Sequence, residues 1–434
     1  MVRPIILRRG RLIDPRHRLS AIRDLVLREG RVAEVSERAA AIEGALVIDA
    51  TDRWILPGLI DLHVHLREPG EEGKETIRTG SRAAVAGGFT AVVAMPNTRP
   101  VNDTPLVTRY VQQRAKEADL CQVFVAGAIS KGLKGEEMAE IGELASVGCV
   151  CLTDDGRPVM NAGLLRRAFL YARAFDLPVM LHEEDLSLSG HGAMSEGPRA
   201  TRLGLMPIPP SAEVAMVARD LVIAEETQGR LHLAHLSCEA SVRLLREAKK
   251  RGLNVTGEVT PHHFTLTDAA VEGYDTHAKM SPPLRQNEDV RAIREAMADG
   301  TIDVIATDHA PHGALDKEVE FDKAANGVIG LETALALTLE LVHQGVLSRE
   351  RAVELLTSGP ARAFGLPGGH LGVGAPANVT VVDPSARWTV NASEFYSKSR
   401  NTPFQGRGLL GKVTQTIVGG RVVFEDGKVM ERAE

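Results

Sequence analysis

A His-x-His pair is the first candidate for metal chemistry in this chain. His63 and His65 end an apolar run at residues 59–65, and Pro69-Gly70 follows as a turn signal. On a strand, side chains alternate between faces, so the two imidazoles point the same way, about 6–7 Å apart. Two histidines in this arrangement can ligate one Zn²⁺ or a similar ion. Two ordinary histidines at a strand end give the same pattern, so the interpretation depends on further ligands.

Strand-like and helix-like segments alternate through the middle of the chain. The strand-like runs are residues 59–65, 90–95, 123–128, 149–153, 179–182, 231–235, 255–259 and 302–307. Residues 162–174 and 211–227 have helical spacing, and Ser211 is the expected cap of the second helix. Eight strands with intervening helices favour a (β/α)₈ barrel over an open doubly wound sheet.

Six of the eight runs end in histidine or aspartate, at the strand ends where barrel active sites collect. These residues are His63 and His65, Asp154 and Asp155, His182, His235, His262 and His263, and Asp308, His309 and His312. Four histidines and two carboxylates exceed the needs of one tetrahedral zinc ion and fit two divalent ions that share a carboxylate and a hydroxide. Such a pair activates water and polarises a carbonyl group, which predicts metal-assisted hydrolysis, or its reverse, at a C–N or ester bond.

Asp308 has a second predicted role in this chemistry. It can ligate one ion while accepting the proton of the attacking water, and it can then pass that proton to the leaving nitrogen. The sequence contains no Gly-x-Ser-x-Gly motif and no phosphate-binding glycine-rich loop before a helix, so serine hydrolase and nucleotide chemistry are not expected.

Short strand-like runs mark both ends of the chain, around the different middle. They are residues 5–8, 25–27, 32–35 and 46–48 near the start, and residues 378–382, 388–390, 416–418 and 421–424 near the other end. Turn signals such as Gly419-Gly420 separate them. The two ends are therefore predicted to form one small β domain together.

Composition narrows the possible partners and location. The chain has 434 residues, 44% hydrophobic and 25% charged, which fits one large globular domain with a smaller one. The net charge is −6 and no long basic block occurs, so nucleic acid is not an expected partner. The charged start is unlike a signal peptide, no apolar run has membrane-spanning length, and the four cysteines lack CxxC spacing. A cytoplasmic protein with buried, reduced thiols is expected.

The motifs together resemble those of class I dihydroorotases of the amidohydrolase superfamily, over essentially the whole chain. The matching segments are 61–70 (DLHVHLREPG), 95–98 (MPNT), 153–156 (TDDG), 182–185 (HEED), 235–237 (HLS), 260–263 (TPHH), 282–285 (PPLR) and 306–312 (ATDHAPH). The resemblance implies an α/β fold with a (β/α)₈ barrel at residues 57–369 and a β-sandwich domain built from residues 1–56 and 370–434. It also implies interconversion of dihydroorotate and N-carbamoyl-L-aspartate in pyrimidine biosynthesis.

The resemblance further implies two zinc ions joined by a bridging hydroxide. His63, His65 and Asp308 match the ligands of the first ion, and His182 and His235 match those of the second. Many relatives bridge the ions with a carboxylated lysine, but residues 147–153 contain no lysine. The bridging position falls to Asp155, with Asp154 as the alternative.

Substrate contacts can also be carried over from the resemblance. Arg67 matches the residue that binds the substrate carboxylate, which a guanidinium can hold bidentately. The alternative is a surface arginine paired with Glu68 or Glu71. Asn97 and His312 match other substrate contacts, whereas His309 and His262 are interpreted as structural or hydrogen-bonding residues.

Two positions depart from the family pattern where substrate contacts are expected. Ser281 replaces the usual Asn before Pro-Pro, and Ala325-Asn326-Gly327 replaces the usual Pro-Phe-Gly, so Ser281, Asn326 and Gly327 become the candidates there. Related hydantoinases and allantoinases can carry Ser or Ala at the first position, which weakens the substrate prediction. Arg67 strengthens it, because those relatives need no carboxylate clamp. Residues 312–327 form either a lid over the site or an ordinary surface loop.

Two alternative functions remain open at this stage. One is a hydantoinase- or allantoinase-type cyclic amidase on the same fold. The other is a non-catalytic scaffold that binds aspartate carbamoyltransferase, although such scaffolds typically lose metal ligands and this chain keeps all six. A homodimer is the expected assembly, with an aspartate carbamoyltransferase complex as a further expectation.

Overall fold

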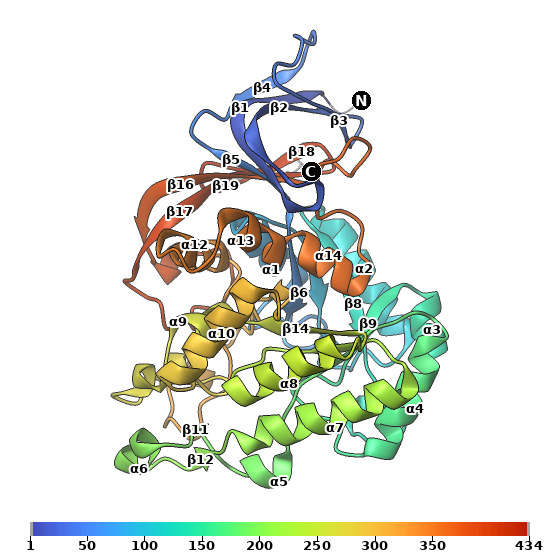
Figure 1. Ribbon diagram of the computed structural model, residues 1–434, viewed down its shortest axis with the longest axis vertical. Coiled ribbons are helices and arrows are strands. Elements are labelled where there is room, and N and C mark those ends of the chain that lie inside the picture. The colour runs from blue at the N-terminus through green and yellow to red at the C-terminus, as the bar shows by residue number, and fades with distance from the viewer. Residues whose placement is uncertain (1–2, 432–434) are drawn as a thin grey trace.

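Eight parallel strands form the central sheet of the chain, in a computed structural model that describes residues 3–431 (Figure 1). In order they are β6 (Leu59–Val64), β7 (Phe89–Ala94), β8 (Gln122–Gly127), β9 (Cys149–Leu152), β10 (Val179–Leu181), β13 (Leu231–Leu233), β14 (Val255–Val259) and β15 (Val304–Ile305). The sheet closes because Val64 bridges to His309, and the His65 N–H donates to the His309 carbonyl at 2.8 Å. This is the predicted (β/α)₈ barrel, so the fold class is confirmed.

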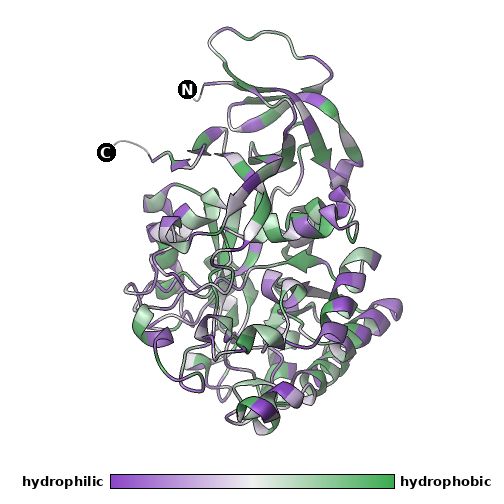
Figure 2. Cartoon of the chain, turned by 90° about the vertical axis from the view of Figure 1, so that its left-hand side faces the viewer, coloured by the Kyte–Doolittle hydropathy of each residue, from purple (hydrophilic) through white to green (hydrophobic). Residues whose placement is uncertain are grey.

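Helices surround the barrel and bury the outer faces of its strands. The longer ones are α1 (Ile77–Ala86), α2 (Pro105–Ala118), α3 (Ile141–Ser146), α4 (Ala162–Arg173), α7 (Ser211–Thr227), α8 (Glu239–Lys250), α10 (Asn287–Asp299), α12 (Ala334–His343), α13 (Arg349–Leu356) and α14 (Ser358–Phe364). Figure 2 shows hydrophilic residues on the outward sides of these helices and hydrophobic residues on the strands within. Strands β6 and β7 are buried at every residue, as expected when both faces of a parallel sheet are covered.

Short elements lie in the loops that leave the strands. They are α5 (Leu186–Ser189), β11 (Met194–Ser195), α6 (Pro198–Leu203), β12 (Pro207–Ile208), α9 (Pro261–Thr265) and α11 (Ala314–Lys317). Strand β15 is shorter than the predicted run at residues 302–307. The chain leaves the strand ladder after Ile305, because the N–H and hydroxyl of Thr307 both donate to the side chain of Asp61, at 3.1 and 2.6 Å.

The two helices predicted in detail both form, with one correction. Helix α4 starts as predicted, and its N-cap Asn161 accepts a hydrogen bond from the Leu164 N–H at 3.1 Å. Helix α7 has the predicted bounds, but Pro210 is its N-cap and Ser211 is already helical, so the predicted Ser cap is wrong.

Strands from both ends of the chain form one nine-stranded sheet at one end of the barrel (Figure 1). They are β1 (Ile5–Asp14), β2 (Leu19–Arg28), β3 (Arg31–Ser36), β4 (Leu46–Asp49), β5 (Trp54–Pro57), β16 (Val379–Thr389), β17 (Gly408–Val418), β18 (Arg421–Glu425) and β19 (Lys428–Val429). The antiparallel pairing of β5 with β16 joins the two halves. Leu7, Leu25, Ile55, Val379 and Ile417 share its buried apolar core.

Several strands of this sheet run beyond their apolar runs. Strand β1 continues past Arg8 through a register shift, where the Arg9 N–H donates to the buried Asp24 at 2.9 Å. The separate runs at residues 378–382 and 388–390 belong to the single strand β16. The composite β domain is therefore present, while its proposed bounds at residues 56 and 370 stay a prediction. Residues 1–2 and 432–434 of the predicted domain lie outside the described residues.

Two further expectations concern membrane-spanning segments and the cysteines. Within residues 3–431, no helix combines the length and the apolar character needed to cross a membrane. All four cysteines are buried and free, as predicted.

Candidate metal centre

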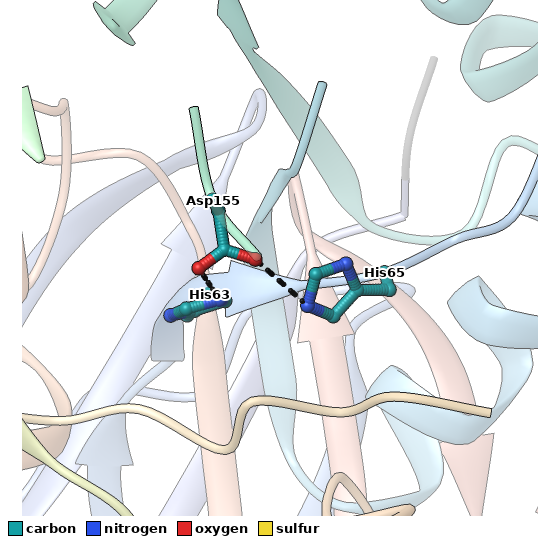
Figure 3. A group of neighbouring side chains, drawn as sticks. All are labelled: His63, His65 and Asp155. Atoms are coloured by element: carbon teal, nitrogen blue, oxygen red, sulfur yellow. Dashed lines mark ion pairs between the residues drawn. The ribbon is translucent and has the colours of Figure 1, made fainter. Parts of the chain in front are cut away.

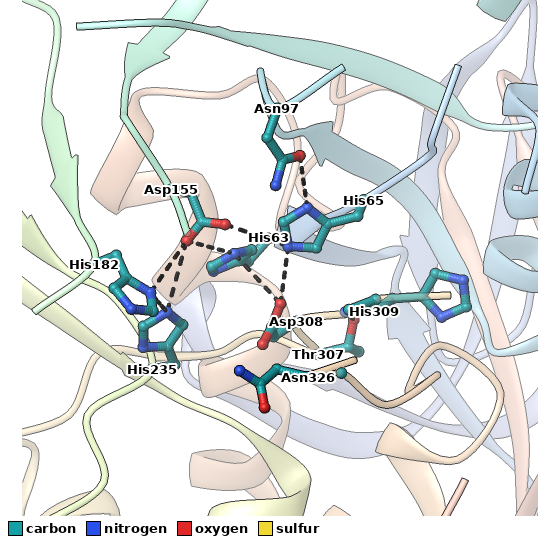
Figure 4. Close-up of polar contacts among 12 residues, drawn as sticks. His63, His65, Asn97, Asp155, His182, His235, Thr307, Asp308, His309 and Asn326 are labelled. Atoms are coloured by element: carbon teal, nitrogen blue, oxygen red, sulfur yellow. Dashed lines mark hydrogen bonds and ion pairs between the residues drawn. The ribbon is translucent and has the colours of Figure 1, made fainter. Parts of the chain in front are cut away.

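The six predicted metal ligands lie together at one end of the barrel, next to the carboxyl ends of its strands (Figure 4). His63 lies on β6, and the other five follow barrel strands within a few residues. They are His65 after β6, Asp155 after β9, His182 after β10, His235 after β13 and Asp308 after β15. Parallel barrel strands direct their carboxyl ends to one face, which explains why segments so far apart in sequence meet here.

The cluster has two parts that share one carboxylate. We call His63, His65 and Asp155 the first half, and Asp155, His182 and His235 the second half. In each half, one ligand atom per residue lies within 4.8 Å of the others, and all of the residues are buried. His235 and Asp308 have left-handed backbone conformations, with φ of 30° and 47°. Such conformations are uncommon for residues other than glycine and gather at functional sites.

In the first half, two imidazoles converge on the Asp155 carboxylate (Figure 3). His63 Nε2 lies 3.2 Å from Asp155 Oδ1, and His65 Nε2 lies 3.3 Å from Asp155 Oδ2. Asp308 completes this side, because its Oδ1 lies 3.0 Å from His65 Nε2 and 3.5 Å from His63 Nε2. Three carboxylate oxygens and two imidazole nitrogens therefore face a common point.

Hydrogen bonds from Nδ1 fix the orientation of both imidazoles of the first half. The His63 Nδ1–H donates to Glu258 Oε1 at 2.8 Å, and the His65 Nδ1–H donates to Asn97 Oδ1 at 2.9 Å. Each Nε2 is thereby left as the free ligand atom. Burial alone would raise the pKa of Glu258, but hydrogen bonds from His232 and His63 lower it to about 2. Glu258 thus stays ionised although it is completely buried.

Asp61 positions His63 and Asp308 at once. Its carboxylate accepts hydrogen bonds from the His63 N–H and from the N–H and hydroxyl of Thr307, the residue before Asp308. Asp61 therefore joins the first barrel strand to the last and holds Asp308 opposite His63. Burial raises the pKa of Asp61 to about 7.

The second half is organised differently. His182 Nδ1 and His235 Nε2 face each other at 3.0 Å, and they lie 3.8 and 3.6 Å from Asp155 Oδ1. The His182 Nε2–H donates to Glu184 Oε2 at 3.0 Å, and Glu184 also accepts a hydrogen bond from the Ser281 hydroxyl at 3.3 Å. The outer nitrogen of His235, Nδ1, is buried without a hydrogen-bond partner.

The donor set fits a metal site. His63 Nε2 and Asp155 Oδ1 are buried without a hydrogen-bond partner, an arrangement that is costly unless another group binds them. Burial would raise the pKa of Asp155, but His63, His235 and His65 lower it well below its usual value, so it is an anion at neutral pH. Imidazole nitrogens with carboxylate oxygens are ligands typical of zinc and similar ions.

Asp154, the alternative bridging residue, lies outside this cluster. Its carboxylate accepts hydrogen bonds from the Ile129 N–H at 2.8 Å, the Ser130 N–H at 3.0 Å and the Ser130 hydroxyl. These bonds fix the loop after β8. Asp155 is the member of the pair that faces the histidines.

A cavity of about 260 Å³ opens above the cluster and contains all of the predicted substrate residues. They are Arg67, Asn97, Ser281, His312, Asn326 and Gly327. The predicted ligands also line it, except His63, which is completely buried beneath. Glu184 lines the cavity as well and was missed from the sequence. Glu258 was also missed: it is the only charged residue of β14, but nothing in the sequence shows that it is buried.

Arg67 is buried beside the cluster rather than exposed. Its Nε–H donates to the Pro311 carbonyl at 3.1 Å, and its Nη2 lies 3.3 Å from His312 Nε2. Burial and the charge of Arg67 lower the pKa of His312 to about 3, so its ring is neutral. The His312 Nε2–H donates to the Asn326 carbonyl at 2.8 Å and cannot also accept from Arg67. The Arg67 guanidinium can therefore donate a hydrogen bond from Nη2 to an anion in the cavity.

Of the two carboxylates that were alternative partners of Arg67, Glu71 lies at ion-pair distance, 3.9 Å, whereas Glu68 pairs with Arg114 at 2.7 Å. The contact with Glu71 is therefore present, but on a buried arginine rather than on a surface one. His309 points away from the cluster (Figure 4), where it contacts Glu75 at 3.3 Å. His262 is buried, and its Nε2 has no hydrogen-bond partner among the described residues, so of the two predicted roles the structural one fits its surroundings.

Known proteins resemble the chain over nearly its whole length. The family model described as "Dihydro-orotase-like" matches residues 52–241, and the "Amidohydrolase family" model matches residues 211–424. A dihydroorotase of Anaeromyxobacter sp. (strain K) is 59% identical over 421 residues, which cover 96% of this chain and 97% of that protein. A dihydroorotase of Syntrophotalea carbinolica is 53% identical over 420 residues, or 97% and 99% of the two chains.

Among solved structures, an L-hydantoinase (dihydropyrimidinase) of Arthrobacter aurescens has the same fold. It superimposes with a TM-score of 0.90 at 27% identity, covering 99% of this chain and 98% of that one.

Proposed function

Because the chain belongs to the dihydroorotase family, within the amidohydrolase superfamily, we infer that it is a dihydroorotase, an enzyme that interconverts dihydroorotate and N-carbamoyl-L-aspartate. The observation that carries this inference is the buried Arg67 in the same cavity as the histidine–aspartate cluster. Both compounds carry a carboxylate on the carbon atom that lies two bonds from the carbonyl carbon of the amide bond that is made or broken. A site for them needs a cation at a fixed distance from the hydrolytic centre.

We propose that the cluster holds two Zn²⁺ ions. His63, His65 and Asp308 would ligate one, His182 and His235 the other, and Asp155 would be shared. When bound, the ions would supply an activated water and polarise the substrate carbonyl.

Asp308 has the environment of a base for this reaction. Burial would raise its pKa, but His63 and His65 lower it far below the usual value, so the carboxylate is ionised at neutral pH. During hydrolysis it accepts a proton from the attacking water. As the C–N bond breaks, it returns that proton to the leaving nitrogen, and cyclisation runs through the same positions in reverse.

The cavity residues hold the substrate in place for this proton transfer. Arg67 binds the substrate carboxylate. Asn97 accepts from His65 through its carbonyl oxygen, which leaves the Nδ2 amide as a donor for the substrate. Ser281 donates to Glu184 and presents its hydroxyl oxygen as an acceptor. Asn326 and Gly327 line the cavity next to His312.

A hydantoinase-type activity is the second candidate, favoured by the likeness to the L-hydantoinase of Arthrobacter aurescens. The two differ in their use of Arg67, because a cyclic amide without a carboxylate has nothing for a buried guanidinium to bind. The scaffold alternative is disfavoured by the complete ligand set. A cytoplasmic location, a homodimer and a complex with aspartate carbamoyltransferase stay predictions from the family resemblance.

Turnover of dihydroorotate, hydantoin and allantoin by the zinc-loaded protein tests the proposal, together with a metal count. We expect dihydroorotate to be the substrate, and Arg67→Met to lower its kcat/KM about 10²-fold or more, with unchanged metal content. Arg99→Met is the matched control, because Arg99 is exposed and lies 3.8 Å from Glu71. Good hydantoin turnover without dihydroorotate turnover would reject the proposal in favour of the second candidate.

A further inference from the structure

A buried lysine lies beneath the loop that forms one wall of the substrate cavity. Lys317 is the last residue of α11, within residues 312–327, and it is only 2% exposed. Its ammonium donates to three backbone carbonyls, those of Thr276 at 3.0 Å, Lys279 at 3.1 Å and Ala325 at 2.6 Å. A long charged side chain in this position is unusual, because lysine is almost never fully buried unless its charge is paired.

No carboxylate among the described residues pairs directly with this charge. None has an oxygen within ion-pair distance of Lys317 Nζ, so the three carbonyl oxygens are the direct partners of the ammonium. By contrast, Lys323 in the same loop is 66% exposed and lies 3.4 Å from Glu320. Burying a cation without a counter-ion costs stability that an apolar side chain would avoid. The three carbonyl contacts therefore indicate that Lys317 fixes the geometry of the segments it binds, rather than increasing the free energy of unfolding.

The three carbonyls belong to the two chain segments that carry cavity residues. The Ala325 carbonyl immediately precedes Asn326 and Gly327, which line the cavity. The carbonyls of Thr276 and Lys279 belong to the segment that leads into Ser281, which also lines the cavity.

Other hydrogen bonds connect the same two segments around the ammonium. The Gly327 N–H donates to the Lys279 carbonyl at 3.0 Å, the same oxygen that Lys317 binds. The Thr276 hydroxyl donates to the Lys317 carbonyl at 2.7 Å. Lys317 thus lies at the centre of a network that fixes the spacing between the two walls.

We propose that Lys317 is a positioning residue for substrate binding, which holds the Asn326-Gly327 wall at a fixed distance from the Ser281 wall. This inference rests on the proposed function, since it concerns the same cavity. Lys317 touches neither the cavity nor the metal ligands, so its effect passes through the backbone that it binds. Without the ammonium, the loop at residues 312–327 loses three of the hydrogen bonds that attach it, and substrate binding weakens more than the chemical step.

The charges around Lys317 give this role a pH dependence. Burial, helped by the positive charge of Lys279, lowers the pKa of Lys317 to about 7, while Asp275 and Asp316 act in the opposite direction. His312 also faces Lys317, but its ring is neutral because burial and the charge of Arg67 lower its pKa to about 3. A neutral amine keeps two protons for three carbonyls, so one carbonyl loses its donor as the pH rises.

The test compares Lys317→Met with Lys323→Met in the zinc-loaded enzyme. Methionine fills a similar volume but donates no hydrogen bond. We expect KM for dihydroorotate to rise about tenfold or more in Lys317→Met, with a smaller change in kcat and unchanged metal content. Backbone amides at residues 313–327 should exchange hydrogen faster, whereas barrel strands should not change. Lys323→Met should match the wild type in every measurement.

A second variant covers the case in which Lys317→Met does not fold. Lys317→Gln keeps a polar, neutral donor, and we expect a smaller rise in KM and a weaker dependence of KM on pH between 6 and 9 than in the wild type. An unchanged KM or unchanged loop exchange in the folded variants would overturn the proposal, as would a loss confined to kcat. Hydrogen exchange can be measured without turnover. If the wild type were inactive on dihydroorotate but loop exchange still rose in the Lys317 variants, the proposed function would fail while the positioning role of Lys317 would stand.

Discussion

Both histidines of the first half of the metal cluster have an orienting partner, whereas in the second half only His182 does. His63 and His65 donate to Glu258 and Asn97, and both acceptors come from rigid positions next to barrel strands. The Nδ1 of His235 is buried without a hydrogen-bond partner among the described residues. The protein therefore orients the ligands of the first half in the absence of an ion, whereas the position of His235 in the second half would depend more on the ion itself. The difference indicates that the two proposed ions sharing Asp155 would not be held equally well.

The largest expected effect separates catalysis from metal binding within the first half. Asp308→Asn removes the proposed base but leaves His63, His65 and Asp155 in place. We expect kcat to fall about 10³-fold while most of the metal is retained, because the amide cannot accept the proton of water. Steady-state kinetics with metal analysis measures both, and Asp316→Asn in the nearby loop is the control. Near-normal turnover would contradict the role of Asp308, and loss of both ions would contradict the independence of the two halves.

The next effect concerns the residues that orient the histidines. Glu258→Gln should lower the affinity for the first ion by about 10- to 100-fold, since an amide cannot accept from both His63 and His232. Glu184→Gln should weaken only the second ion, because Glu184 contacts His182 alone among the ligands. Titration of the metal-free variants against a coloured chelator measures each affinity. The asymmetry would be refuted if both variants weakened the same ion.

A smaller effect is expected on the rates at which the unmodified protein releases its two proposed ions. Under limiting chelator, one ion should leave severalfold faster than the other, because His235 has no partner to hold its ring in place. His235→Ala should retain the slowly released ion and lose the fast one. Release of both ions at one rate would show that the shared Asp155 couples the halves completely.

The smallest effect is on acid stability of the metal-free protein. Burial would raise the pKa values of Glu258 and Glu184, but hydrogen bonds from their histidine partners lower both to about 2. A carboxylate with a depressed pKa stabilises the fold above its unfolded pKa of about 4, and this stabilisation is lost as the pH falls toward 2.

The two glutamates should differ in this loss, because the Glu184 side chain is 21% exposed and Glu258 is fully buried. Urea unfolding at pH 5 and pH 3 should therefore show a smaller pH dependence for Glu258→Gln than for Glu184→Gln. Equal slopes would indicate that burial does not distinguish the two carboxylates.

Much of the fold could be predicted from periodicity, because most barrel strands are apolar runs and six of the eight runs end in histidine or aspartate. Periodicity was less reliable where side chains replace backbone hydrogen bonds. Strand β15 ends early because Asp61 takes the donors of Thr307, and β1 continues because Asp24 supports its register shift. Such contacts join residues far apart in the sequence and have no local pattern.

The site shows the same limit. The motifs predicted the histidines that meet in the cluster, but they could not choose between Asp154 and Asp155. That choice depends on backbone donors at Ile129 and Ser130, which take up the first carboxylate. Glu258 and Lys317 were not among the predicted residues, because their roles arise from burial, which the sequence alone does not reveal for a charged residue.

The seam between the first and last strands of the barrel has a consequence for how the protein matures. Asp61 and Thr307 are 246 positions apart in the chain, as the hydrogen bond that joins them shows. His63 and His65 follow the first of these residues, and Asp308 follows the second. A nascent polypeptide cannot bring Asp308 to the two histidines until nearly three quarters of it has been synthesised and the barrel has closed. For the proposed metal centre, binding of the first ion is then expected late in biogenesis, and fragments that end before the last barrel strand should not capture it.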